Sequence, residues 1–180
     1  NGFINLKYSD VYVFQYIQNT SNTFKEIIRN ENLKSYLLDY GGMNIGKAMH
    51  VGHIRSLNIG RGIKNLLLAA GHEVVSDIHL GDWGMPVAQI LNYCYKNELD
   101  IKSISIQDLE EIYPKASELS KEDQEFFESS QRINKKLNSK DSTVRDGWNH
   151  IYKISTDEIK KTLSRFGHNF DIFEGESDAN

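Results

Sequence analysis

Cysteine and proline are scarce in this sequence. Its one cysteine, Cys94, has no second thiol for an intramolecular disulfide and no cysteine partner for a metal site. We therefore expect a reducing, cytoplasmic compartment, with Cys94 packed in the core. Only two prolines, Pro86 and Pro114, occur, so no proline-rich linker is visible.

Long apolar runs and a strongly basic charge are also missing. No run approaches the roughly 18 apolar residues of a membrane span, so we predict no contact with a membrane. The net charge of -4 excludes a chain-wide electrostatic grip on nucleic acid, and any RNA contact should be local or lie elsewhere. With 39% hydrophobic and 26% charged residues among 180, the chain has the composition of one globular domain, with at most a small appendage.

Three short patterns occupy the first 40 residues. The opening NGFINLKYSDVYVFQYIQ alternates apolar and polar residues and predicts one extended strand. It has no initiator methionine, so we expect it to be the tail of something longer. Residues 23–32 have the pattern of a short helix, and residues 34–40 that of a buried strand, which Gly41 and Gly42 end.

A helix and a second strand follow. Apolar residues recur at helical spacing over residues 51–70, and residues 72–80 have a strand pattern that ends in a Gly-Asp-Trp-Gly turn. Strand, helix and strand together predict a parallel sheet with a right-handed crossover, whose ligands gather at the carboxyl ends of the strands. The loops 41–49 and 81–85 both fall at that edge.

The rest of the chain is predicted to be mainly helical. Residues 85–97 form a second helix candidate, and the polar stretch 100–141 is typical of helices with solvated faces. Helical spacing returns over residues 142–166, and the segment 168–171 is expected to re-enter the sheet. The predicted fold class is α/β: part of a Rossmann-like, parallel-sheet nucleotide-binding domain with an inserted, mainly helical segment.

Two histidines stand where the glycine-rich loop gives way to the long helix. In His50-Val51-Gly52-His53, both imidazoles project from the first helical turn, where free backbone N–H groups and the helix dipole attract an anion. Gly52 leaves room for a flat base or sugar near the backbone, and Lys47 adds a mobile cation for phosphate. The pattern therefore favours phosphate binding without a side-chain nucleophile.

Simpler interpretations of these histidines stay open. His50 and His53 could instead cap the helix or satisfy buried carbonyls. A metal site is less favoured, because no acidic or cysteine ligand stands at a recognised spacing, although His79 could approach. We therefore predict no protein-held metal.

A longer string resembles a known family. N-I-G-K-A-M-H-V-G-H-I-R-S, residues 44–56, resembles the class I HIGH motif of arginyl-tRNA synthetases, with its upstream asparagine and lysine. G-H-E-V at 71–74 and H-L-G-D-W-G at 79–84 resemble that family's second strand and the turn after it. Further matches, which extend the resemblance over nearly the whole chain, lie at residues 2–5, 170–171 and 176–177.

This resemblance implies an arginine-tRNA ligase, which uses ATP to form arginyl-adenylate and then charges tRNA(Arg). It implies that His50 and His53 contact ATP and steady its phosphate during attack by the arginine carboxylate, with Gly52 beneath the adenosine. Lys47 would assist at the phosphates, and Mg²⁺ would accompany ATP. The arginine-binding residues implied are Asn44, Glu73 and Asp82.

Some of these positions depart from the family or have a simpler interpretation. Family members commonly have proline, asparagine and glutamine where this sequence has Met43, Ile78 and Pro86. Asp82 could be a turn residue bonded to its own backbone, and Glu73 a solvated strand end. The arginine pocket is therefore less closely defined than the phosphate site.

By the same resemblance the chain divides into four parts. The expected parts are the end of an amino-terminal domain with its linker (1–31), the first half of the catalytic domain with the HIGH motif (32–98), a helical insertion (99–165) and a return toward the catalytic domain (166–180). The K-M-S-K-S signature and an anticodon-binding domain do not occur in these residues. We therefore expect a chain truncated at both ends and inactive alone.

Two other classes of function stay open. A class I relative, such as a cysteinyl synthetase or a nucleotidyltransferase, shares the H-x-G-H chemistry but not the second string, and one cysteine cannot supply the zinc ligands of a cysteinyl enzyme. A non-catalytic paralogue would keep the fold as a binding module. The whole protein is expected to be a monomer that meets tRNA(Arg) mainly through other domains.

Overall fold

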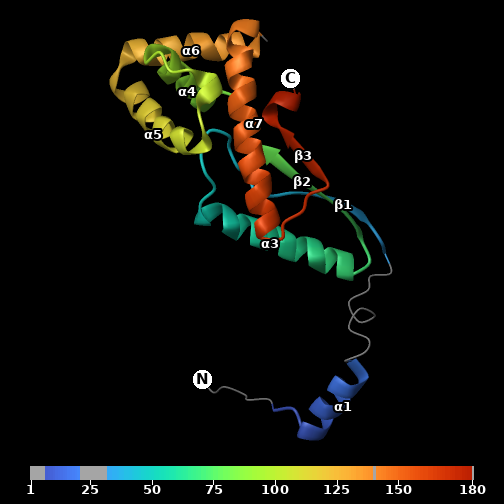
Figure 1. The fold of residues 1–180 in the computed structure, drawn as a ribbon. Helices are drawn as coiled ribbons and strands as arrows, with labels where there is room; N and C mark the ends of the chain where they lie inside the picture. The colour runs from blue at the N-terminus through green and yellow to red at the C-terminus, as the bar shows by residue number, and fades with distance from the viewer. Residues whose placement is uncertain (1–6, 21–31, 140, 180) are drawn as a thin grey trace, which may run out of the picture.

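The computed structural model describes residues 7–20, 32–139 and 141–179. Three parallel strands form one sheet in the order β1 (Ser35–Asp39), β2 (Glu73–Leu80) and β3 (Ile172–Gly175). The α3 helix (Val51–Ala69) connects β1 to β2 and packs against both strands. The predicted parallel strand–helix–strand unit is therefore confirmed (Figure 1).

Helices make up most of the remaining chain. They are α4 (Met85–Lys96), the short 3-10 helix η1 (Ile101–Ser103), α5 (Ile106–Glu122), α6 (Gln124–Asn138), α7 (Ser142–Arg165) and, after β3, η2 (Glu176–Ala179). In Figure 1, α4, α5 and α6 lie together at one end, and α7 runs from them along the sheet toward α3. The predicted helices and the return to the sheet are confirmed, whereas the division into domains stays a prediction.

The prediction for the first residues is wrong. Residues 10–18, expected in an extended strand, belong to the helix α1 (Asp10–Thr20). The Ser9 hydroxyl accepts a hydrogen bond from the Tyr12 N–H (3.2 Å), and the rings of Tyr8, Tyr12 and Tyr16 stack in sequence. Aromatic side chains four residues apart meet on a helix but not on a strand, so the tyrosine spacing was the better signal. Residues 1–6 and nearly all of the helix expected at 23–32 lie outside the described residues.

Two hydrophobic clusters form the core. One joins α4 to α7 and contains Ile45, Ile90, Leu91 and Cys94, which confirms that Cys94 packs in the core. The other joins α3, β2 and the carboxyl-terminal part of α7 around Met43. Because Met43 and Ile45 are neighbours in the loop after β1, this loop lies at the junction of the two clusters.

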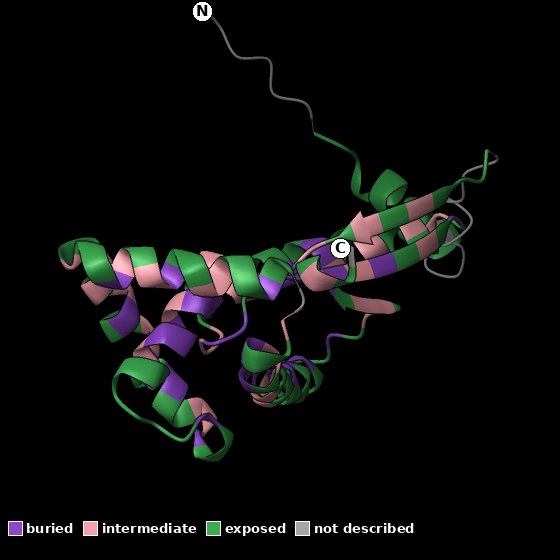
Figure 2. Ribbon diagram, turned by 90° about the horizontal axis from the view of Figure 1, so that it is seen from above, coloured by how far each residue is buried: buried purple, intermediate pink, exposed green. Residues whose placement is uncertain are grey.

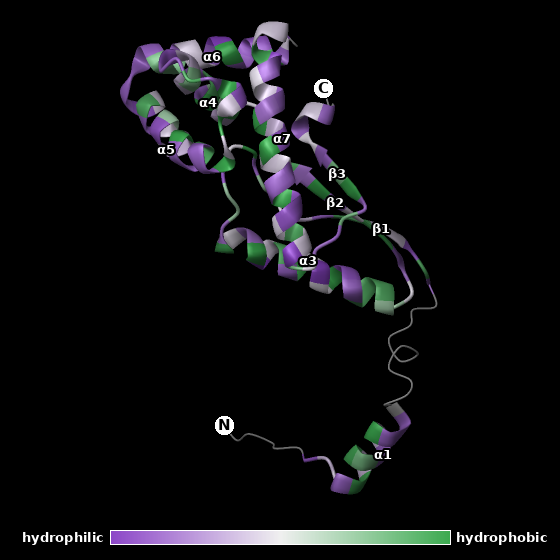
Figure 3. Cartoon of the chain, viewed as in Figure 1, coloured by the Kyte–Doolittle hydropathy of each residue, from purple (hydrophilic) through white to green (hydrophobic). Residues whose placement is uncertain are grey.

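The outer faces of α5 and α6 are largely polar. Buried, half-buried and exposed residues alternate along the helices in Figure 2, as expected where one face covers a core. Hydrophilic residues occupy much of α5 and α6 in Figure 3, which fits the predicted solvated faces. Within the described part of the chain, no helix is both long and apolar enough to cross a membrane.

A charged clamp connects α3 to the sheet. Lys64 Nζ donates to Asp171 Oδ2 (2.9 Å) and to Ser76 Oγ (2.7 Å). The same Asp171 oxygen accepts from the Ser76 N–H (2.8 Å) and from its hydroxyl (2.8 Å). These donors, the Ser76 backbone first, lower the pKa of Asp171 from 3.8 to about 2. The clamp holds the chain at the point where it enters β3.

Replacing Asp171→Asn should lower the free energy of unfolding at neutral pH by about 1 kcal/mol, a modest value because the carboxylate is half-exposed. Since folding depresses this pKa, the contribution is complete above the ordinary value of 3.8 and is lost as the pH falls toward 2. Thermal unfolding over this pH range measures it. The difference between wild type and variant should shrink with acid; a constant difference would show that the charge is not responsible.

Candidate nucleotide-binding site

The loop after β1 continues the sheet pairing beyond the strands. The Met43 carbonyl accepts from the Gly81 N–H (2.8 Å), and the Ile45 N–H donates to the Gly81 carbonyl (3.1 Å), so Asn44 and Gly81 form a parallel bridge. A Cβ at residue 81 would overlap the end of the Asn44 side chain, so the side chain of Asn44 lies directly against Gly81. The two loops expected at the carboxyl edge of the sheet are therefore joined by their backbones.

Gly46 fastens the same loop to two helices. Its φ of +81° is unfavourable for residues with a side chain, and a Cβ would overlap Ile90 of α4. Its N–H donates to the buried Ser155 Oγ of α7 (3.0 Å). The helical segment thus fixes the path of the loop one residue before Lys47.

Replacing Ser155→Ala should cost about 1–3 kcal/mol of unfolding free energy, because the buried Gly46 N–H would lose its acceptor without access to water. Thermal unfolding gives the value. The matched control is Ser164→Ala, at an exposed position of the same helix, which should change little. Equal effects of the two variants would show that the bond to Gly46 contributes nothing.

The two histidines cap α3 reciprocally. His50 Nδ1 accepts from the Gly52 N–H (3.2 Å), and His53 Nδ1 accepts from the His50 N–H (3.1 Å). The rings stack with their centroids 3.9 Å apart, and a Cβ at Gly52 would come within 3.0 Å of the His50 ring. A nitrogen that accepts carries no proton, so each neutral imidazole has its N–H at Nε2, facing away from the helix backbone.

The environment of His53 favours a neutral imidazole. Burial, then the neighbouring His50 and Lys47, lower the pKa of His53 below its ordinary value of 6.5. The positive end of the helix dipole acts in the same direction, since it disfavours a cation at the first turn. At neutral pH the helix therefore begins with two stacked Nε2–H donors beside its own backbone N–H groups, an arrangement suited to an anion.

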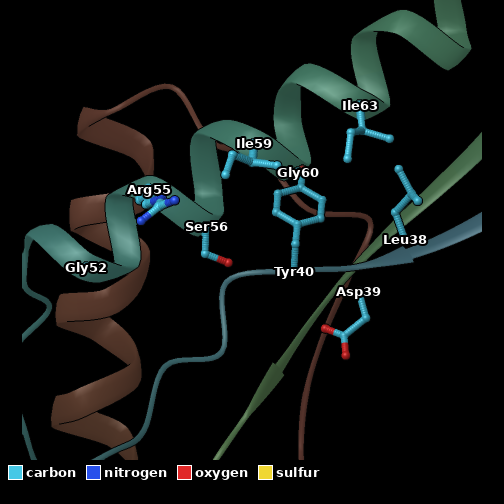
Figure 4. A pocket seen from close by; sticks show the side chains of 9 residues that line it. All are labelled: Leu38, Asp39, Tyr40, Gly52, Arg55, Ser56, Ile59, Gly60 and Ile63. Carbon is cyan, nitrogen blue, oxygen red and sulfur yellow. The ribbon is translucent and has the colours of Figure 1, made fainter.

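A cavity of about 440 Å³ extends from Gly52 along α3 and β1 (Figure 4). The Tyr40 ring points at Gly60 of α3, where any Cβ would overlap it, while the Asp39 carboxylate turns away from the helix. Isoleucines 59 and 63 supply much of the apolar lining. One end of the cavity therefore meets the histidine cap.

The predicted arginine-binding residues lie in three different settings. Asn44 is exposed at the carboxyl edge, where it bridges to Gly81. Asp82 is fully buried: its carboxylate accepts from the Ser177 N–H (2.9 Å) and hydroxyl (2.6 Å), and Trp148 Nε1 donates to its carbonyl (2.8 Å). These bonds hold β2 to the turn after β3, so the structural interpretation of Asp82 fits its contacts.

Glu73 is not brought to this edge. It begins β2, seven residues before Leu80, and at about 3.3 Å per residue this places it roughly 23 Å away. Its carboxylate accepts from the Ser35 hydroxyl (2.7 Å) at the opposite end of the sheet. The simpler interpretation, a solvated strand end, describes its position.

The three departures from the family pattern lie outside the cavity lining. Met43 and Ile78 pack together in the cluster under α3, and a Cβ at Gly41 would come within 3.1 Å of Ile78. Pro86 stands in the first turn of α4, where its missing N–H costs no helical hydrogen bond. Core packing thus accounts for Ile78 and helix initiation for Pro86.

Sequence analysis missed three residues near the site. Asp39 ends β1 beside the loop, and its position at the carboxyl edge could have drawn attention to it. Ser155 and Tyr113 contact the loop from helices more than 60 residues downstream, and no local pattern signals such contacts. Among the described residues, no three His, Cys, Asp or Glu side chains are grouped so as to hold a metal ion.

Parallel strands, a glycine-rich loop and a helix start with outward N–H donors define a Rossmann-like nucleotide-binding domain. The family model described as tRNA synthetases class I (R), catalytic domain, matches residues 16–180. The chain belongs to this family.

Similar proteins agree with the assignment. The chain is 31% identical over 193 residues to the arginine–tRNA ligase of Alkaliphilus oremlandii and 33% identical over 195 residues to that of Francisella tularensis subsp. novicida. Each match covers 99% of this chain and 33% of the relative. The chain thus spans about a third of the length of these curated relatives.

Solved structures show the same fold. Arginyl-tRNA synthetase from Plasmodium falciparum superimposes with a TM-score of 0.62 and 27% identity, covering 83% of this chain and 26% of that one. The Thermus thermophilus arginyl-tRNA synthetase gives a TM-score of 0.61 at 22% identity, over 88% of this chain and 27% of its own, which is a likeness of fold alone.

Proposed function

We propose that this chain provides the ATP-binding part of an arginine-tRNA ligase. The observation that carries the proposal is the reciprocal histidine cap, which leaves two Nε2–H donors at the amino terminus of α3. The choice of arginine as the amino acid and of tRNA(Arg) as the RNA rests on the family and on the names of the relatives. The whole protein would first activate arginine with ATP and then transfer it to tRNA(Arg).

In the first step, an oxygen of the arginine carboxylate bonds to the α-phosphorus of ATP. The bond from that phosphorus to the bridging oxygen breaks, and pyrophosphate leaves with the electron pair. Negative charge grows on the phosphate oxygens as this happens, and His50 and His53 would donate hydrogen bonds to it through Nε2–H, which their capping bonds leave free. Lys47 would contribute a cation at the phosphates, and Gly52 would let the adenosine approach the helix.

For arginine we propose Asn44, because it is exposed at the carboxyl edge, where parallel sheets bind their ligands. Asp82 would act indirectly, by holding β2 to the turn at Ser177. The distant Glu73 has no place in this proposal.

The other components of the reaction are proposed from the family. Mg²⁺ would arrive with ATP and be held by its phosphates. The tRNA would be held mainly by parts of the protein that these residues do not include. The cytoplasmic setting and the monomeric state stay predictions.

Arginine-dependent exchange of pyrophosphate into ATP by the whole protein tests the proposal, with and without tRNA(Arg). His50→Ala or His53→Ala should reduce exchange at least ~100-fold, the effect of removing one preorganised donor from a developing charge. Alanine also removes a helix cap, so loss of folding must be separated from loss of chemistry.

The matched control is His50→Asn, because asparagine is a good N-cap residue but lacks the outward Nε2–H. It should keep the melting temperature of wild type while exchange falls as in His50→Ala. Exchange that survives in the asparagine variant would show that capping is the whole role of His50. Pyrophosphate exchange that depends on another amino acid would contradict the proposed specificity for arginine. No exchange in the wild-type protein would favour a binding module without catalytic activity.

A further inference from the structure

The ammonium of Lys47 lies over an aromatic ring of the helical segment. Its Nζ is 5.6 Å from the centroid of the Tyr113 ring, within the range of a cation–π contact. Tyr113 belongs to α5 and packs at the margin of the first hydrophobic cluster, so its ring has neighbours that fix its orientation. The Lys47 ammonium therefore connects the loop to Tyr113, which lies 66 positions downstream.

Lys47 stands three residues before the histidine cap, and its charge acts on that cap. Lys47 contributes to lowering the pKa of His53, after burial and the neighbouring His50. The backbone one residue earlier is fixed by the bond from Gly46 to Ser155. The lysine therefore extends from an anchored loop, with Tyr113 on one side and the cap within electrostatic reach.

Carboxylates are the obvious rival partners. Glu110 and Glu158 line a small cavity with Lys47, but Glu158 pairs with Lys161 (3.3 Å). Within the described ranges, no ion pair joins Lys47 to a carboxylate. An aromatic face holds a cation without neutralising it, so the ammonium stays available to a phosphate.

We propose that Tyr113 is a positioning residue that keeps the Lys47 ammonium beside the histidine cap, ready to meet the phosphates of ATP. The catalytic part of this proposal, the contact between Lys47 and ATP, rests on the proposed function. A lysine side chain has four rotatable bonds, and a contact near its end restricts it most. The ring face supplies this contact, and the phenolic hydroxyl is not needed.

A double-mutant cycle in the whole protein tests the coupling, with pyrophosphate exchange as the readout. Tyr113→Leu should lower kcat/KM for ATP roughly two- to fivefold, as expected for a partly exposed cation–π contact, and leave KM for arginine unchanged. Tyr113→Phe should retain wild-type values. In a Lys47→Met background, Tyr113→Leu should have no further effect, because its target is gone.

The geometry itself can be measured without activity. Reductive methylation with carbon-13 formaldehyde labels the lysines of the whole protein and preserves their charge. The Lys47 signal, assigned by its loss in Lys47→Arg, should be shifted upfield by the Tyr113 ring current. Tyr113→Leu should abolish the shift and Tyr113→Phe should keep it. The matched control Glu110→Gln alters a carboxylate of the same cavity and should change neither the shift nor kcat/KM for ATP.

The outcomes separate this inference from the proposed function. Absence of arginine-dependent exchange in wild type would refute the function, while the ring-current shift would still decide whether Tyr113 holds Lys47. Additive losses in the cycle, a loss in Tyr113→Phe equal to that in Tyr113→Leu, or an unshifted Lys47 signal would overturn the positioning role. A loss of both signatures in Glu110→Gln would assign the role to the carboxylate.

Discussion

The backbone bridge between Asn44 and Gly81 fixes the positions of the other groups in the site. It holds the loop to the carboxyl end of β2, so that the chain leaves the sheet at one defined point. Gly46 is then held by Ser155, and α3 begins six residues after Ile45. Since Met43 and Ile45 belong to different hydrophobic clusters, the loop cannot shift without disturbing the packing of both. This packing against both clusters fixes the loop that carries the proposed phosphate site.

The histidine pair connects folding to chemistry. Capping and ligand binding stand as alternatives in the sequence, but the two nitrogens of an imidazole allow both at once. Nδ1 of each ring satisfies a backbone N–H of the first turn, and Nε2–H remains for a ligand. Because the cap requires an unprotonated Nδ1, the same hydrogen bonds select the tautomer that would donate to phosphate in the proposed function. The start of the helix thereby orients the donors proposed for catalysis.

Local patterns predicted much of the fold because periodicity and glycine stops are local properties. These properties predict the strand at 34–40 and the helix at 51–70. They also predict that the loops after the two strands lie together at the carboxyl edge of the sheet. The prediction for the first segment was wrong because tyrosines four residues apart, placed among polar residues, resemble the apolar–polar alternation of a strand. Glu73 and Asp82 could not be placed by motif alone, since strand direction and a contact with Ser177 decide their surroundings. The contacts of Ser155 and Tyr113 arise only from tertiary packing.

The proposed chemistry rests on neutral imidazoles at His50 and His53 that cap α3 through Nδ1 and present Nε2–H. Nitrogen-15 NMR of the histidine rings tests this most directly, because protonated and unprotonated ring nitrogens differ widely in chemical shift. At neutral pH we expect an unprotonated Nδ1 and a protonated Nε2 in both residues, and a change in the two Nε2 signals when ATP is added to the whole protein. Imidazolium rings, Nδ1–H tautomers, or Nε2 signals indifferent to ATP would contradict the account.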